Sequence, residues 1–475
     1  DRGRMKVLLI NPPYDGNINT WTPESTNKAI GTQPPMGIAY LASMLEKEKI
    51  GVAILDANAL GIGTDGIREA IKRERPDIIG ITAMTLISRN AAAVSRIAKE
   101  ASNAVTVIGG PHVTLFQKET LENRSVDYAM DGESEYSFLE FVKAIGSNRP
   151  VEGIEGLVYM RGDDVAANKI AVVDDLDSLP FPAVHLLPNN RYSLANAKNP
   201  FGSIVTSRGC PFKCSFCIRG PIDKFVRFRD PRNVVDEIEY LIKDFNVKEI
   251  NIRNDTVTLK RSHIMGICEE LLRRDINIRW QGPTRVDCVD REMLFLMKRA
   301  GCHTLRYGIE SGNQDTLDRM GKGTTLKQIR DAVRWTREAG MEIMAYFMVG
   351  YIDETEEAIM DTIDFAREID PDGAIFSIGT PLPNTELFRR AVEKGLIDPD
   401  YWKDFVTGRR YDRAPYLIKD AEKWARKALW SFYFRPRYIV KRLRKIDSWD
   451  AFKKHAVGAY SFLRFKMNKQ EPLTS

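Results

Sequence analysis

The sequence predicts an α/β protein of several domains, in which a doubly wound parallel sheet precedes a partial barrel of strand–helix units. Three observations support this fold class. The chain has 475 residues, which is too long for one hydrophobic core. Short apolar runs alternate with helical patterns over residues 5–145 and again over 201–390, as in parallel sheets. A hydrophobic content of 43% with 28% charged residues fits a soluble globular chain.

The first predicted domain, residues 1–145, is a Rossmann-like unit. Buried apolar runs predict strands at 6–11, 52–56, 78–82, 105–108 and 128–130. Amphipathic stretches predict helices at 38–48 and 88–101, and another helix that begins with the run 131–135. Doubly wound sheets bind ligands at the carboxyl ends of strands, so the residues that follow these strands are the candidates for a binding site.

The rest of the chain divides into three further parts. Residues 146–200 hold several prolines and are expected to form a linker with a small hairpin at 156–160 and 170–173. Residues 201–390 form a partial (β/α)6 barrel, whose chemistry is expected at the carboxyl ends of its strands. Its strands are predicted at 203–207, 249–253, 277–281, 304–309, 343–349 and 374–379. Residues 391–475 are predicted to be a helical, basic domain.

Three cysteines in one short run are the most informative motif. Cys210, Cys214 and Cys217 follow the first predicted barrel strand with the spacing C-x3-C-x2-C. Three thiolates hold three corners of a cubane iron–sulfur cluster and leave one iron open. A zinc knuckle needs a fourth ligand, and a disulfide leaves one thiol unpaired. The other three cysteines are expected to be buried apolar thiols, namely Cys268, Cys288 and Cys302.

This spacing, just after a strand, resembles the radical S-adenosylmethionine (SAM) superfamily. The resemblance implies a [4Fe-4S] cluster whose open iron binds SAM, and one-electron cleavage of SAM to a 5′-deoxyadenosyl radical. It also implies SAM-binding roles for residues near the predicted strand ends: Phe216, Asp255, Arg285, Glu310, Ser311 and Gly350. Plain alternatives are a packing aromatic for Phe216, a solvated loop for Asp255 and a surface position for Arg285. The run Gly350-Tyr351-Ile352-Asp353 departs from the Gly-x-Pro-Gly pattern of the family.

Motifs of the first domain resemble the cobalamin-binding domains that precede some radical SAM domains. The resemblance rests on residues that follow the first, third and fourth strands: Asn11, Pro12, Thr82, Gly109, Gly110 and His112. It implies that a hydroxyl and bare glycine backbone line a slot for the nucleotide tail of cobalamin. An α/β domain without a ligand, and a capping or core role for His112, are the alternatives. The loop Tyr14–Asn17 lacks the histidine that replaces the lower base of cobalamin in some relatives.

The chain is therefore identified as a member of the cobalamin-dependent radical SAM enzymes, a group that includes the anaerobic magnesium-protoporphyrin monomethyl ester cyclases. The resemblance implies three cofactors: a [4Fe-4S] cluster, SAM and cobalamin. The expected function is methylation of an unactivated carbon through methylcobalamin. The alternatives are a cobalamin-dependent oxidation, cyclisation or rearrangement, and a radical SAM enzyme whose first domain binds something other than cobalamin.

The charge distribution bears on partners and location. Residues 421–475 carry 14 Lys or Arg against 4 Asp or Glu, whereas the rest carries 56 against 61. The basic, aromatic C-terminal helices would either cap the barrel or lie on an anionic membrane surface. We expect a small-molecule or lipid-like substrate, a reductant such as flavodoxin or ferredoxin, and no nucleic acid. Few cysteines and the absence of a leader pattern predict a cytoplasmic protein, with peripheral contact to the inner membrane face as an option.

Overall fold

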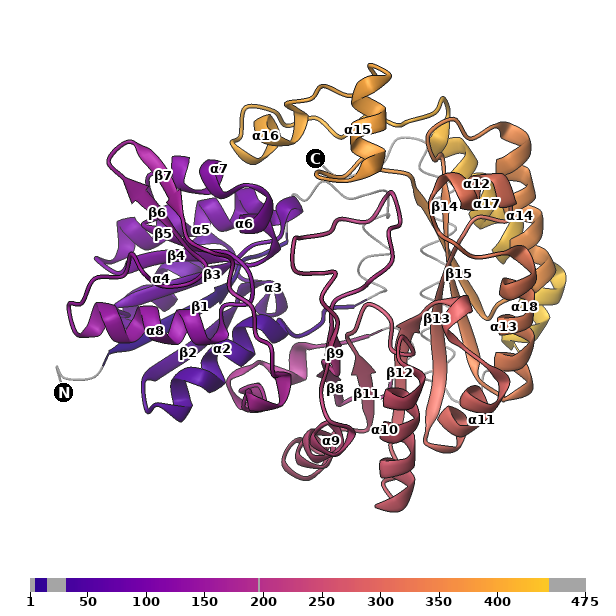
Figure 1. Cartoon of the computed structure of the whole chain (residues 1–475), viewed down its shortest axis with the longest axis horizontal. Helices are drawn as coiled ribbons and strands as arrows, with labels where there is room; N and C mark the ends of the chain where they lie inside the picture. Colours follow the sequence, from indigo (N-terminus) through magenta and orange to yellow (C-terminus); the bar gives the residue numbers. More distant parts are fainter. Residues whose placement is uncertain (1–4, 15–30, 195–196, 444–475) are drawn as a thin grey trace.

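The computed structural model describes residues 5–14, 31–194 and 197–443. Within these residues the chain forms two α/β bodies that lie side by side, with a helical C-terminal segment that touches both (Figure 1). The predicted alternation of strands and helices is confirmed in both bodies, and one predicted strand, at 170–173, is absent from the described residues.

The first body is built on a seven-stranded sheet with the order β2-β1-β3-β4-β5-β6-β7. The first five strands are parallel, and β6 and β7 add an antiparallel hairpin to the edge at β5. Strand order reverses between β1 and β3, which is where ligands bind in such sheets. The strands are β1 (Lys6–Asn11), β2 (Gly51–Asp56), β3 (Ile78–Thr82), β4 (Val105–Gly109), β5 (Tyr128–Met130), β6 (Leu157–Arg161) and β7 (Asp164–Ala167).

Alternating side chains of these strands bury both faces of the sheet. One face packs on α2 (Met36–Lys47) and α8 (Glu135–Gly146), and the other packs on α4 (Thr64–Glu74) and α5 (Ser88–Ala101). Strand side chains alternate in direction, so Leu9 joins the first core and its neighbours Leu8 and Ile10 join the second. The short elements of this body are α3 (Ala57–Leu60), η1 (Thr85–Ile87), α6 (Pro111–Leu115) and α7 (Gln117–Glu122).

The prediction of the hairpin's second strand at residues 170–173 was wrong. The chain turns earlier, at Gly162, whose φ of 65° lies in the left-handed region that glycine tolerates. The second strand is β7, and Ala171 instead forms a parallel bridge with Gly132. Residues 146–200 therefore extend the first sheet and hold the short helices η2 (Leu176–Ser178), η3 (Val184–Leu186) and η4 (Asn189–Arg191).

The second body is an open sheet of six parallel strands with the order β15-β14-β13-β12-β11-β8. Its helices run along the outer side, away from the first body (Figure 1). The strands are β8 (Phe201–Ile204), β11 (Glu249–Ile252), β12 (Arg279–Thr284), β13 (Cys302–Glu310), β14 (Glu342–Val349) and β15 (Gly373–Ile378). The helices are α9 (Pro231–Phe245), α10 (Arg261–Arg273), η5 (Val286–Cys288), α11 (Arg291–Arg299), α12 (Gln314–Arg319), α13 (Leu326–Glu338) and α14 (Glu356–Ile369).

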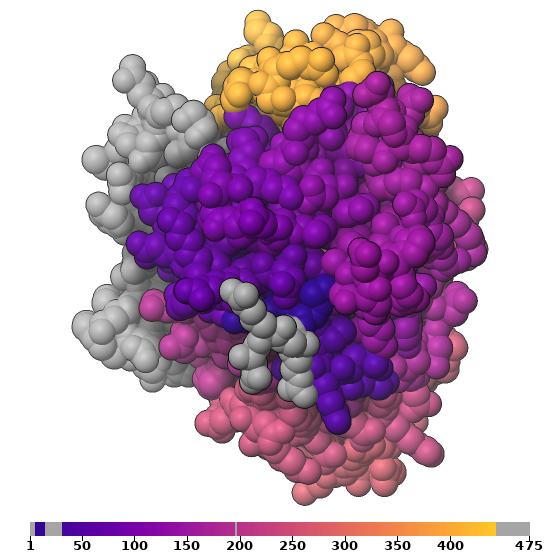
Figure 2. Space-filling model, turned by 90° about the vertical axis from the view of Figure 1, so that its left-hand side faces the viewer, coloured from indigo at the N-terminus to yellow at the C-terminus, as the bar shows by residue number. Residues whose placement is uncertain are grey.

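The C-terminal helices serve two purposes. Helices α15 (Glu386–Glu393) and α16 (Tyr401–Val406) share an apolar cluster with Phe116 of the first body, and Figure 2 shows this orange segment resting on that body. Helix α17 (Ala421–Tyr433), followed by α18 (Pro436–Leu443), packs on the outer strand β15. Among the described helices, none has the length and apolar character that a bilayer-crossing segment needs.

Candidate active site

The three cysteines of the motif lie in a loop that a two-stranded ribbon presents. The ribbon pairs β9 (Ser207–Arg208) with β10 (Arg227–Phe228), and the loop runs between them. Gly209 begins the loop with a φ of 96°, and a Cβ atom there would lie 2.5 Å from the carbonyl oxygen of Phe225. The turn into the motif therefore requires glycine.

The thiols of this loop are free and accessible. Cys210 and Cys214 are half-buried and Cys217 is exposed. Cys268 and Cys302 are buried as expected, whereas the same expectation was wrong for Cys288, which is half-buried. Partial removal of the sulfur from water, together with the neighbouring charges of Cys214 and Cys210, raises the pKa of Cys217 to about 11. The thiols therefore lie near one another, and bound iron would stabilise their thiolate forms. In the described part of the chain, no group of three or more His, Cys, Asp or Glu side chains is arranged to hold a single metal ion.

Contacts with distant segments hold the cysteine loop in place. The amide of Cys210 donates to the carbonyl of Asp223 at 2.6 Å. Ser215 donates from its amide and its hydroxyl to the carbonyl of Met320, and its hydroxyl lies 2.8 Å from that of Tyr351. The loop is thus fastened to the residue that ends α12 and to the segment that follows β14, on the side of the barrel where its chemistry is expected.

Arg285 lies directly beside the cysteine loop. One guanidinium nitrogen is 3.5 Å from the sulfur of Cys214, and the guanidinium carbon is 3.6 Å from the ring centre of Phe212. The same group makes a bidentate pair with Asp287, at 2.9 Å for each bond. The structure places Arg285 at the predicted site, but its charge is already paired. Its role toward the SAM carboxylate stays a prediction.

Glu310 ends β13 in a strained conformation. Its φ of 69° is in the left-handed region, which non-glycine residues rarely adopt and which is typical of functional sites. Its carboxylate accepts a hydrogen bond of 2.9 Å from Lys322, and both side chains are largely buried. Ser311 is fully buried, and its hydroxyl lies 2.9 Å from that of Thr362. Ser311 therefore ties β13 to α14, and its assignment to SAM stays a prediction.

The remaining predicted SAM residues lie around the same strand ends. Gly350 follows β14 with a φ of 77°, and its amide donates to the carboxylate of Glu354 at 2.6 Å. Phe216 packs against the apolar cluster of α15 and α16. Asp255 follows β11, and partial burial raises its pKa. The sequence reasoning missed Lys322 and Glu354 as members of this site, although Glu354 belongs to the run after Gly350.

A cavity of about 330 Å³ opens between the first sheet and the helices α2 and α8. Thr82, Gly109 and Gly110 line it, as predicted for a slot that holds the tail of cobalamin. A Cβ atom on Gly109 would have no protein neighbour closer than 3.8 Å, so any side chain there would project into the cavity. The bare backbone and the empty volume therefore fit a flat inserted group.

The other predicted cobalamin residues lie outside this cavity. Asn11 is buried and donates to Asp56 at 2.8 Å, while its own side-chain oxygen has no partner among the described residues. Pro12 is buried next to it. His112 lines a separate cavity of about 620 Å³ and stacks on Phe116, and burial lowers its pKa to about 4. Its cobalamin assignment, like those of Asn11 and Pro12, stays a prediction. Most of the loop Tyr14–Asn17 lies outside the described residues.

The two bodies meet in a network of buried ion pairs. Arg208, which stands two residues before Cys210, pairs with Glu135 at 2.6 Å. Arg227 makes a bidentate pair with Glu133 at 2.6 and 2.8 Å. Arg208, Glu133 and Glu135 also line the 330 Å³ cavity. The ribbon that carries the cysteine loop therefore forms one wall of the predicted cobalamin slot.

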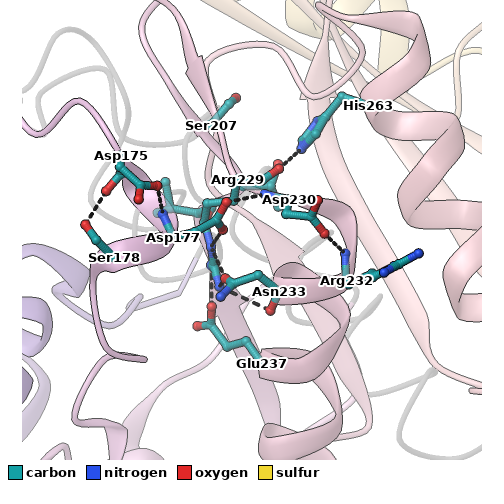
Figure 3. A network of polar contacts seen from close by, with 12 residues as sticks. Asp175, Asp177, Ser178, Ser207, Arg229, Asp230, Arg232, Asn233, Glu237 and His263 are labelled. Atoms are coloured by element: carbon teal, nitrogen blue, oxygen red, sulfur yellow. Dashed lines mark hydrogen bonds and ion pairs between the residues drawn. The ribbon is translucent and has the colours of Figure 1, made fainter.

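A second polar network holds the base of the ribbon (Figure 3). Arg229, just after β10, is buried and pairs with Glu237 of α9 and with Asn233 at 2.9 Å. His263 of α10 lies 3.0 Å from the carbonyl oxygen of Arg229. The amide of Asp230 donates to Asp177 of the preceding linker at 2.7 Å. The ribbon is thus anchored to two helices and to the linker.

Comparison with known proteins identifies both bodies. Residues 204–366 match the model of the radical SAM superfamily, and residues 26–142 match the model of the B12 binding domain. An uncharacterised methyltransferase of Pyrococcus horikoshii is 35% identical over 92% of this chain and 94% of its own length. The anaerobic magnesium-protoporphyrin IX monomethyl ester cyclase of Rubrivivax gelatinosus is 32% identical over 85% of this chain and 73% of its own.

Solved structures agree on the fold. The radical SAM methyltransferase TsrM from Kitasatospora setae, solved with cobalamin and a [4Fe-4S] cluster bound, superposes with a TM-score of 0.69 at 21% identity. The match covers 82% of this chain and 78% of TsrM. The cobalamin-dependent radical enzyme OxsB gives a TM-score of 0.71 at 20% identity over 98% of this chain and 71% of its own. The predicted fold class and family are confirmed, and the chain belongs to the cobalamin-dependent radical SAM enzymes, in which a B12-binding domain precedes the radical SAM domain.

Proposed function

We propose that this enzyme transfers a methyl group to an unactivated carbon of a small molecule, with a [4Fe-4S] cluster, SAM and cobalamin as its cofactors. One observation carries the proposal: the cysteine loop and the predicted cobalamin slot share the wall formed by Arg208. Methyltransferase names among the relatives, including one at 35% identity, support the same reaction class.

When bound, these cofactors supply reductive cleavage of SAM and a transferable methyl group. The residues of the chain supply binding and orientation. Cys210, Cys214 and Cys217 would hold three irons and leave the fourth to SAM. The bare backbone at Gly109 would admit the tail of cobalamin. The balanced overall reaction takes R–H, two SAM and two electrons to R–CH₃, S-adenosylhomocysteine, methionine and 5′-deoxyadenosine.

The chain's own groups also fix the geometry of the site. The ion pair between Glu310 and Lys322 places a carboxylate, already partnered, at the end of β13. The contacts of Ser215 with Met320 and Tyr351 keep the cysteine loop over the strand ends. Groups fixed before a reaction lower its barrier, because their ordering costs nothing at the moment of reaction.

A cobalamin-dependent cyclisation or oxidation is the second candidate. The specific observation in its favour is the 32% identity to a magnesium-protoporphyrin monomethyl ester cyclase. The two candidates differ in the fate of the methyl group of SAM. In the first it appears in the product, and in the second it does not.

The test uses full-length protein, reconstituted anaerobically with iron, sulfide and hydroxocobalamin. It is supplied with methyl-labelled SAM, a flavodoxin or ferredoxin reductant, and candidate small molecules. We expect about four irons per chain, a corrin spectrum, 5′-deoxyadenosine, and label in the product. The variant Cys214→Ala should lose the cluster and all 5′-deoxyadenosine, whereas Cys268→Ala, a buried thiol outside the loop, should retain both. Label absent from a product that forms would favour the second candidate, and bound zinc in place of iron would overturn both.

The described C-terminal helices support the predicted capping role more than contact with a membrane. Trp424, Ala428 and Phe432 of α17 are buried in the core of the second body. The hydroxyl of Tyr433 donates to the carbonyl of Ala374 at 2.7 Å, and it accepts from the amide of Ala374 at 3.0 Å. The aromatic side of this helix thus covers the outer strand β15. Most of the predicted basic tail lies outside the described residues.

A further inference from the structure

The inner face of the six-stranded sheet carries the side chains that face the first body. Along β14, and along β13 from Leu305 onward, half-buried residues alternate with buried ones. The half-buried set points away from the helices and toward the interior of the partial barrel. It comprises Arg306, Gly308 and Glu310 on β13, and Glu342, Met344, Tyr346 and Met348 on β14.

Two arginines stand at the same level of this interior. Asn251 of β11 is in register with Gln281 of β12, and Pro283 of β12 is in register with Arg306 of β13. Arg253 follows Asn251 by two residues, as Pro283 follows Gln281. Arg253 and Arg306 therefore lie at one level, two strands apart, which places their backbones roughly 10 Å from each other. An arginine side chain spans half of that distance with ease.

Their hydrogen bonds show that both guanidinium groups face the interior. Arg253 donates to the side-chain oxygen of Gln33 at 2.9 Å, and Asn251 donates to the same oxygen at 2.9 Å. Arg306 donates to the side-chain oxygen of Gln281 at 3.1 Å. The guanidinium groups of Arg253 and Arg306 are thus held by neutral side-chain amides, those of Gln33 and Gln281, and Gln33 belongs to the first body.

Neither cation has an anionic partner among the described residues. The one further bond is from Arg306 to the carbonyl of Ile252 at 3.4 Å. A guanidinium has five N–H donors, so most donors of both groups remain unused. Arg306 is half-buried and Arg253 is more exposed, and partial removal from bulk water lowers the pKa of both arginines. A half-buried charge such as that of Arg306 is normally paired.

Four other arginines, whose side chains are largely buried, follow that rule. Arg208, Arg227, Arg229 and Arg285 each pair with a carboxylate. The carboxylate of Glu310, on the same inner face, is held by Lys322 instead. Arg253 and Arg306 therefore lie close together on the inner face, and neither has a carboxylate partner among the residues that the structure describes.

We propose that Arg253 and Arg306 together bind an anionic group, a carboxylate or a phosphate, of the substrate. The proposal rests on the proposed function, because it places the substrate between the two bodies. Arginine pairs with both groups through parallel N–H donors. The cysteine loop and Glu310 lie at the carboxyl ends of the strands, so the anionic end would lie deeper in the barrel than the reacting carbon.

The test measures binding of inorganic phosphate and of acetate to the reconstituted full-length enzyme by calorimetry. Arg253→Gln and Arg306→Gln should each weaken binding of at least one anion about 10- to 100-fold, since each removes a charge-assisted pair. Arg306→Lys should recover part of the loss. The control is Arg299→Gln, because Arg299 is exposed at the end of α11 on the outer side of the sheet. Iron content and circular dichroism check that the variants fold.

Equal anion affinity in the wild type and both Gln variants would overturn the proposal, and so would no binding by the wild type. A second arm compares retention of cobalamin with that of cobinamide, which lacks the nucleotide tail and its phosphate. If the Gln variants lost cobalamin but kept cobinamide, the anion would be the cofactor's own phosphate, and the substrate assignment would fall. If the wild type bound anions through these arginines but made no 5′-deoxyadenosine, the proposed function would fail while the anion site stood.

Discussion

The ion pair between Glu133 and Arg227 should be a main determinant of how the two bodies dock. Two bonds of 2.6 and 2.8 Å join the carboxylate to the guanidinium, and the amide of Val173 donates to the same carboxylate at 2.8 Å. Each of the paired side chains is only 12% exposed. The change Glu133→Ala leaves a buried guanidinium without its counter-charge, and a buried amide without its acceptor.

The expected cost follows from that burial. Breaking a buried pair by removing one partner costs about 3–5 kcal/mol, whereas an exposed pair contributes about 1 kcal/mol or less. The matched control is the pair of Arg330 with Glu368, which is also bidentate, at 2.5 and 3.0 Å. Its side chains are 47% and 51% exposed, so Glu368→Ala should cost about 1 kcal/mol or less.

Urea unfolding followed by tryptophan fluorescence measures both effects. A double-mutant cycle of Glu133→Ala with Arg227→Ala should give a coupling energy above ~1.5 kcal/mol. The variant Glu133→Ala should also retain less cobalamin, because Glu133 lines the predicted cobalamin slot. A coupling energy no larger than that of the exposed pair would refute the idea that these charges join the bodies.

Three further outcomes are expected. Gly109→Leu should abolish retention of cobalamin with the fold intact, because the leucine side chain would enter the slot. The control Gly153→Leu, which has open space around it, should retain cobalamin. Equal corrin absorbance in the two variants would contradict the assignment of the cavity to cobalamin. Burial raises the pKa of Glu354 from 4.5 to about 7. Between these two pH values the folded state therefore holds a proton that the unfolded state has lost. Its contribution to the free energy of unfolding is therefore fully present below pH 4.5 and declines by up to ~1.4 kcal/mol per pH unit as the pH rises to 7. In urea titrations at several pH values, Glu354→Gln should remove this decline of the free energy of unfolding with pH. An unchanged decline in the variant would show that Glu354 does not cause it. Tyr433→Phe should lower the free energy of unfolding by about 1–3 kcal/mol, because the amide and the carbonyl of Ala374 both lose their partner. Tyr411→Phe, at an exposed residue, should change it by less than ~0.5 kcal/mol. Equal effects would show that the contact of Tyr433 with β15 contributes little.

Much of the fold was readable because the signal for it is local. The runs 6–11, 78–82 and 128–130 are apolar and short, and the structure has strands with the same bounds. The cysteine spacing, with a strand before it, likewise lies within a few residues of sequence. The hairpin was misplaced because the cue for it is one glycine in the left-handed region, Gly162, within a polar stretch that has no periodic pattern.

The composition of the site shows the limit of such reasoning. Ser311 was assigned to SAM because it follows an apolar strand, and that assignment stays a prediction, but the sequence did not indicate that its hydroxyl would lie beside that of Thr362 on a later helix. Lys322 joined the site only through its pairing with Glu310. No local pattern marks either contact, because each joins elements that the chain brings together only after folding.

The sequence by itself determined the two domains, the thiol loop and the family, because periodicity and motif spacing depend on neighbours along the chain. Only the tertiary structure decided that Arg208 closes the predicted cobalamin slot, and that Arg253 and Arg306 have no carboxylate partner within the described residues. The physical reason is that a charged side chain is paired only if an opposite charge lies within a few ångströms of it in the folded protein. For these arginines the relevant neighbours lie tens to hundreds of residues away in the chain.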